Sequence, residues 1–75
     1  QSKTHMRMIR TSNWKLVRDF LNPERDELFD LKNDPAESRN VISQKKNDGV
    51  IRELHTQILT RMKALNDSVL KKIKP

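Results

Sequence analysis

Residues 27–40 hold the feature that most restricts the fold: a short apolar run that stops at a proline. The run carries bulky apolar side chains at Leu28, Phe29 and Leu31. A run of this length predicts a strand over 27–31. Asn33-Asp34-Pro35 follows at once, and it must end the strand because proline cannot donate to a ladder and Asn and Asp favour turns. The chain therefore turns sharply here.

Asp34-Pro35-Ala36-Glu37 also has the spacing of a helix start. Asp34 fits the N-cap, and Pro35 fits the first helical position, where a missing N–H costs nothing. Glu37 falls at the third position, from which it can bond back to the Asp34 N–H in a capping box. The spacing predicts a helical turn over 35–39, which Asn40 ends in a left-handed conformation.

The same stretch resembles the C-terminal signature of the type I sulfatases. That signature usually reads Glu-Leu-Tyr-Asp-Leu, then Asp-Pro-x-Glu-x-x-Asn-Leu; here Phe29 stands for the Tyr and Val41 for the Leu. Upstream, Arg-Thr-Ser-Asn-Trp-Lys-Leu-Val at residues 10–17 is similar to the hairpin that precedes it in the family. With the downstream helix, the resemblance covers nearly the whole chain and implies the tail of a sulfatase.

Two further alternating runs precede the signature, and they predict strands at about 6–11 and 14–20. Trp14, Leu16 and Phe20 share one face of the second run, with Trp14 as a core anchor. Thr11-Ser12-Asn13 is a short polar turn between the runs, so we expect a β-hairpin. The strand over 27–31 would then pair antiparallel with the second.

The last third of the chain predicts one amphipathic helix over about 47–66. Its apolar positions recur at steps of three and four: Val50, Ile51, Leu54, Ile58, Met62, Leu65 and Val69. Asn47, Asp48 or Ser43 would cap its start. The predicted fold class is therefore α+β: one domain over 1–75, with an antiparallel sheet of about three strands packed against a C-terminal helix.

Composition excludes several kinds of site. The chain has 75 residues, no cysteine and a net charge of +6, so disulfides, zinc–thiolate sites and thiol nucleophiles are excluded. It contains no apolar run long enough to span a bilayer. Because the chain begins at Gln1 rather than Met, we expect it to have been cut from a longer protein or processed.

The resemblance also implies where the chemistry lies. Type I sulfatases use a formylglycine made within a Cys/Ser-x-Pro-x-Arg motif, together with calcium, and no such motif occurs here. We therefore expect no catalytic residue and no cofactor in this chain, with both belonging to the parent enzyme. Asp30, Asn33 and Asp34 offer too few oxygens for a hard cation, so we expect no metal site.

The remaining reactive side chains favour structural roles. His5 lies near the chain end, and His55 lies beside the apolar helix face without a metal-ligand partner four residues away. A triad of Ser12, His55 and Asp19 lacks a nucleophile elbow.

Four basic residues on the hairpin are the candidate substrate contacts: Arg7, Arg10, Lys15 and Arg18. Arg matches sulfate geometry bidentately, so the four could hold a sulfated substrate at the edge of the parent's pocket. A solvated basic face is the simpler interpretation.

Two functions fit these observations. The first is a non-catalytic structural subdomain that packs on the catalytic domain of a sulfatase, whose family is often periplasmic, secreted or lysosomal. The alternative is a small basic module of β-ribbon and helix that binds nucleic acid or another polyanion, although it has no DNA-reader motif. We also expect the isolated chain to self-associate through the first hairpin, because Ile9 and Val17 leave apolar groups on both of its sides.

Overall fold

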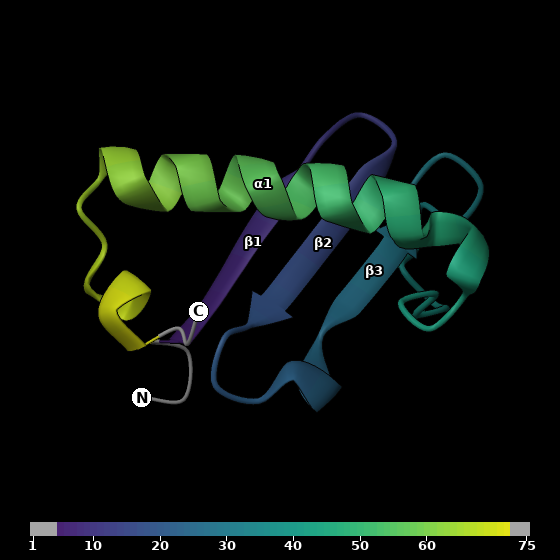
Figure 1. Cartoon of the computed structure of the whole chain (residues 1–75). Coiled ribbons are helices and arrows are strands. Elements are labelled where there is room, and N and C mark those ends of the chain that lie inside the picture. The colour runs from purple at the N-terminus through teal and green to yellow at the C-terminus, as the bar shows by residue number, and fades with distance from the viewer. Residues whose placement is uncertain (1–4, 73–75) are drawn as a thin grey trace.

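The computed structural model describes residues 5–72 and has the predicted α+β fold. A three-stranded antiparallel sheet of order β1-β2-β3 lies under one helix, α1, which crosses one of its faces (Figure 1). The bounds are β1 Met6–Arg10, β2 Trp14–Asp19, β3 Glu27–Asp30 and α1 Asp48–Ala64.

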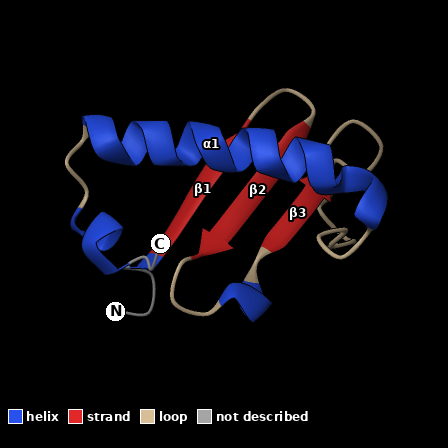
Figure 2. Cartoon of the chain, in the orientation of Figure 1, coloured by secondary structure: helices blue, strands red, loops and turns tan. Residues whose placement is uncertain are grey.

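Three short 3-10 helices complete the described part of the chain (Figure 2). They are η2 Pro23–Arg25, η3 Lys45–Asn47 and η4 Ser68–Lys72. Within residues 5–72, no helix has both the length and the apolar character that a membrane crossing requires.

The strand register decides which side chains face the helix. Ile9 pairs with Leu16, and Leu16 pairs with Leu28, so these three share the face under α1. Leu16 and Leu28 are fully buried. Around them pack Val41, Leu54, Ile58, Met62 and Val69, with Trp14 partly buried against the cluster. Met8 and Val17 pair on the opposite face.

Helix α1 is shorter than the predicted 47–66 because both ends have specific geometry. Asn47 occupies the N-cap position without a side-chain capping bond; its amide donates to the Val41 carbonyl instead, at 3.3 Å. At the other end Asn66 adopts φ 55°. The N–H groups of Asn66 and Asp67 then bond to the carbonyls of Lys63 and Met62, which is a Schellman motif that stops the helix.

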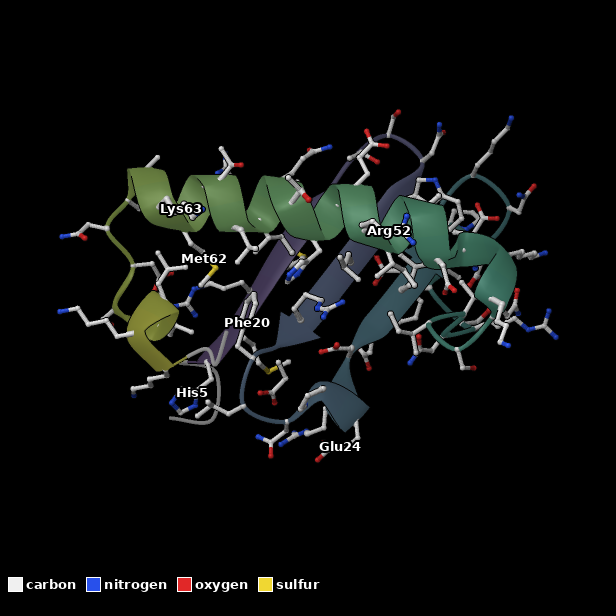
Figure 3. All side chains as sticks on the ribbon, in the orientation of Figure 1. His5, Phe20, Glu24, Arg52, Met62 and Lys63 are labelled. Carbon is white, nitrogen blue, oxygen red and sulfur yellow. The ribbon has the colours of Figure 1, made fainter. Side chains whose placement is uncertain are left out.

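Two residues predicted on the apolar helix face lie elsewhere. Leu65 is the C-cap and is 72% exposed, because the left-handed Asn66 turns the chain before the next core position. Val69 is 3% exposed, yet it reaches the core from η4, which folds back after the helix. Figure 3 shows Met62, the last buried position of α1, on the lower side of the helix above Phe20.

The buried leucine pair gives a direct test of this core. We expect Leu16→Ala to reduce the free energy of unfolding by about 2–5 kcal/mol, because it removes a buried side chain and leaves a cavity. Thermal or urea unfolding followed by circular dichroism measures the change. Val17→Ala is the control, since Val17 lies next in the strand on the opposite face and is only half-buried. Equal losses in the two variants would contradict the assignment of the core face.

Candidate functional site

The loop after β3, residues 32–41, is the part of the signature that departs most from prediction. Residues 35–39 form no helical turn; the Glu37 N–H bonds to the Asp34 carbonyl at 3.0 Å, which closes a single β-turn. The Asp34 side chain does bind main-chain N–H groups, as predicted for a cap, but they belong to the residues that follow this β-turn and not to a helix. Its carboxylate accepts the N–H groups of Ser38 at 3.1 Å and Arg39 at 3.0 Å. These bonds, with that of the Ser38 hydroxyl, hold the pKa of Asp34 below its usual range.

Glu37 makes ion pairs instead of a capping box. It adopts φ 56°, which is the left-handed conformation that the sequence predicts for Asn40. Its carboxylate lies 2.8 Å from the Lys15 Nζ and 3.3 Å from the Arg10 Nη1. The hydrogen bond from Lys15 lowers the pKa of Glu37. Two cations on the sheet attract this carboxylate more strongly than one backbone N–H does, so the loop is drawn against the face opposite α1.

Asn40 covers the outer edge of β3. Its Oδ1 accepts the Leu28 N–H at 2.9 Å and the Ile42 N–H at 3.1 Å. The Val41 N–H bonds to the Leu28 carbonyl at 2.8 Å. Asn40 therefore does not end a helical turn in a left-handed conformation; it pairs the edge strand, whose main-chain groups would otherwise face water.

A polar hollow of about 210 Å³ opens beside this loop. It is lined by Trp14, Asp30, Asn33, Asp34, Arg39, Val41, Gln44, Lys46 and Asn47. Asp30 is engaged within it, since its carboxylate accepts the Asn33 amide at 2.8 Å and this bond lowers the pKa of Asp30. Among residues 5–72, no group of three or more His, Cys, Asp or Glu side chains is placed to hold a metal ion.

The structure does not bring the four basic candidates together. Arg7 pairs with Arg18 across the strands, and Arg10 pairs with Lys15, so alternation places the first pair on the helix side and the second pair on the opposite face. Each of the four lies within 4.0 Å of a carboxylate, namely that of Asp67, Asp26 or Glu37. A single basic patch on the hairpin is therefore not formed.

Arg7 makes the most complete of these ion pairs. Its Nε and Nη2 donate to the two carboxylate oxygens of Asp67 at 2.6 and 2.8 Å. The Arg7 guanidinium lowers the pKa of Asp67 to about 2. Asp67 also accepts the Val69 N–H at 2.9 Å, so one carboxylate joins the first strand to the segment after the helix.

The sequence analysis did not predict the structural role of two buried carboxylates, Asp19 at the end of β2 and Asp26 just before β3. Asp26 is 8% exposed and accepts the Asp19 N–H at 2.7 Å, with the Arg18 Nε 3.3 Å away. Burial raises the pKa of Asp26. Asp19 is also buried, and its Oδ1 accepts the N–H groups of Leu21 and Asn22. Both carboxylates shape the loop between β2 and β3, and only the Asp and Asn content of that loop signals this role.

The surroundings of His55 are those of a side chain packed against its neighbours, and they do not form a catalytic site. Its ring lies 5.9 Å from that of Phe20, centroid to centroid. Its Nδ1 is buried without a hydrogen-bond partner among residues 5–72, and burial lowers its pKa. Ser12 lies in the β1–β2 turn, at the opposite end of β2 from Asp19, so no triad forms.

The fold and the signature loop together define the class: a C-terminal subdomain of a sulfatase. The family model described as N-sulphoglucosamine sulphohydrolase, C-terminal, matches residues 1–64. The chain belongs to this family, as the resemblance of its signature predicts. No curated protein matches the chain at a significant level.

The Arg7–Asp67 pair predicts a specific acid sensitivity. The pKa of Asp67 is about 2 in the folded chain and 3.8 in its ordinary state. A depressed pKa adds stability above the ordinary value, and this stability is lost as pH falls from about 5 toward 2. We expect Asp67→Asn to flatten the fall of the melting temperature over this range. Glu24→Gln is the control, because Glu24 is an exposed residue of η2 (Figure 3) and has no ion-pair partner within residues 5–72. An equal effect of both changes would contradict the assignment.

Proposed function

We propose that the chain is the non-catalytic, structural C-terminal subdomain of a sulfatase, and that it packs on the catalytic domain of that enzyme. The formylglycine and the calcium ion of the reaction would then belong to the catalytic domain. The sequence contains no Cys/Ser-x-Pro-x-Arg motif in which a formylglycine could form.

One observation carries this proposal: the side chains of Asp34, Glu37 and Asn40 in the signature bond within the chain. Asp34 holds the β-turn, Glu37 binds two cations of the sheet, and Asn40 pairs the edge of β3. A motif with these contacts fixes a loop against a sheet. It leaves no carboxylate of Asp34 or Glu37 unbonded for acid–base work.

The sheet face away from α1 supports packing on a larger domain. A hollow of about 380 Å³ lies on this face, and its lining includes Met6, Met8, Val17 and Glu27. Met8 is 51% exposed. Half-buried apolar side chains on a rigid sheet are suited to an interface between domains of one chain.

Arg10 is the best placed of the four basic residues for edging the substrate pocket. Its side chain is 57% exposed, and its 3.3 Å contact with Glu37 is longer than the 2.8 Å contact of Lys15. A sulfate group could therefore reach the Arg10 guanidinium without breaking a buried pair. By contrast, Arg7 is bonded on both nitrogens that face Asp67.

The proposal predicts that the purified chain has no sulfatase activity. We expect no release of sulfate from an aryl sulfate or from glucosamine N-sulfate, with or without calcium, because the reacting groups lie outside this sequence. Ion chromatography of the released sulfate is the measurement, with a buffer blank as reference. Turnover that survives repurification would contradict the non-catalytic assignment.

The structural role of the signature predicts a second result. We expect Glu37→Gln to lower the melting temperature and to speed amide hydrogen exchange at Ser38 and Arg39, because the loop loses its ion pairs with Lys15 and Arg10. Exchange is measured by NMR. Glu53→Gln is a matched control, since Glu53 is an exposed residue of α1 without a partner in the described chain. Unchanged exchange in Glu37→Gln would show that the ion pairs do not hold the loop.

A further inference from the structure

The two edges of the sheet differ in how their main-chain groups are paired. The outer edge of β3 is covered by Asn40 and Val41. Strand β1 forms the other edge. In the β1–β2 ladder, the Thr11 N–H bonds to the Trp14 carbonyl at 2.8 Å, and the Phe20 N–H bonds to the His5 carbonyl at 3.1 Å.

These two bonds fix which groups of β1 face outward. Hydrogen-bonded and non-hydrogen-bonded pairs alternate along an antiparallel ladder. Met8 and Val17 are therefore a non-hydrogen-bonded pair, as are Arg10 and Lys15. The N–H and C=O groups of Met6, Met8 and Arg10 point away from β2. The Met6 carbonyl accepts the Arg7 Nη1 at 2.8 Å, but the main chains of Met8 and Arg10 have no partner within residues 5–72.

We propose that two copies of this chain associate edge to edge through β1, antiparallel about a two-fold axis at Met8. Met8 would exchange both main-chain hydrogen bonds with the partner's Met8. Met6 would pair with the partner's Arg10, and Arg10 with the partner's Met6. The two sheets would then form one continuous sheet, with no edge of β1 left in water.

The composition of β1 selects this register among the symmetric ones. The strand has five residues with Met8 at its centre, so only an axis at Met8 overlaps the whole strand with its copy. An axis at Arg10 would set guanidinium against guanidinium, and like charges directly opposite are destabilising. The proposed register instead places each Arg10 across from an apolar Met6, whose carbonyl has a second lone pair for the new bond.

Repulsion between the two positively charged copies is weaker at this edge than the net charge of the chain implies. Both cations of β1 are already paired: Arg7 with Asp67 at 2.6 Å, and Arg10 with Glu37 at 3.3 Å. The side chains at the centre of the contact, Met8 and its copy, are apolar and half-exposed. The net charge of +6 is therefore carried mainly away from this edge.

A hollow beside β1 gives the partner an apolar surface on the helix side. Its volume is about 110 Å³, and its lining includes Ile9, Ile58, Met62 and the 72% exposed Leu65. In the proposed register the partner's Ile9 lies opposite Arg7, next to this hollow. Ile9 itself faces the core under α1, so a charge placed at Ile9 would test folding rather than association. Met8 is therefore the position at which a substitution tests the contact.

Single cysteines test both the contact and its register, because the chain has no cysteine of its own. Under mild oxidation we expect Met8→Cys to form a disulfide-linked dimer much faster than Val17→Cys. Val17 is the matched control, since it pairs with Met8 on the same face but belongs to the central strand. Equal rates would overturn the proposal. A mixture of Met6→Cys and Arg10→Cys chains should give the mixed dimer in preference to either like dimer; the reverse preference would overturn the register.

The unmodified chain gives the second test. We expect analytical ultracentrifugation to show a concentration-dependent dimer in the micromolar range, and Met8→Lys to weaken it on the order of tenfold by placing two cations across from each other. Circular dichroism and Trp14 fluorescence establish that the variant is folded. A monomer throughout the range would overturn the proposal. So would a dimer that Leu65→Asp disrupts and Met8→Lys leaves intact, because it would be held through α1.

Discussion

Two buried leucines, Leu16 and Leu28, are the contact on which the rest of this structure depends. They are the only large side chains in the described chain that are fully buried, and they lie next to each other on adjacent strands. A three-stranded sheet needs a cover on at least one face, and α1 supplies it by packing Leu54, Ile58 and Met62 against this pair. Because a chain of 75 residues has a thin core, polar interactions add to this contact elsewhere in the structure.

Those polar interactions form a second system on the opposite side of the sheet. Asn40 pairs the edge of β3 next to Leu28, and Glu37 ties the same loop to Lys15 and Arg10. The loop thus binds one edge and one face of the sheet at once. Contacts within the chain thus account for the acidic and amide side chains Glu37 and Asn40 of this loop.

The strands and the helix could be predicted because their signals are local. Alternation in 6–11 and 14–20 and the proline after 27–31 need no knowledge of the rest of the chain. The same alternation also predicts how the basic residues divide. Once the two runs form a hairpin, Arg7 and Arg18 fall on one face of the sheet, and Arg10 and Lys15 fall on the other. The split of the basic residues was therefore within reach of the sequence.

The role of Glu37 could not be predicted from the sequence, because its carboxylate has two alternative partners. One is the local N–H of a capping box, and the other is a pair of cations that only the folded sheet brings near. Asp-Pro-x-Glu satisfies a capping box in isolation. Its actual partners, Lys15 and Arg10, lie 22 and 27 residues away in sequence, and only the folded sheet brings them near. The prediction that Leu65 lies on the buried helix face was wrong for a related reason. The apolar spacing of three and four residues continues in the sequence beyond the point where Asn66 turns the backbone.

The bond between Arg7 and Asp67 has a consequence for where the folded unit stops. It joins residues 60 positions apart, and η4, directly after it, places Val69 in the core. The family match covers residues 1–64, so a boundary drawn from sequence similarity alone would cut between the helix and the segment that closes over its end. The cooperative unit, as its contacts define it, reaches into η4, and a truncation at residue 64 would remove the Asp67 carboxylate that Arg7 of the first strand binds.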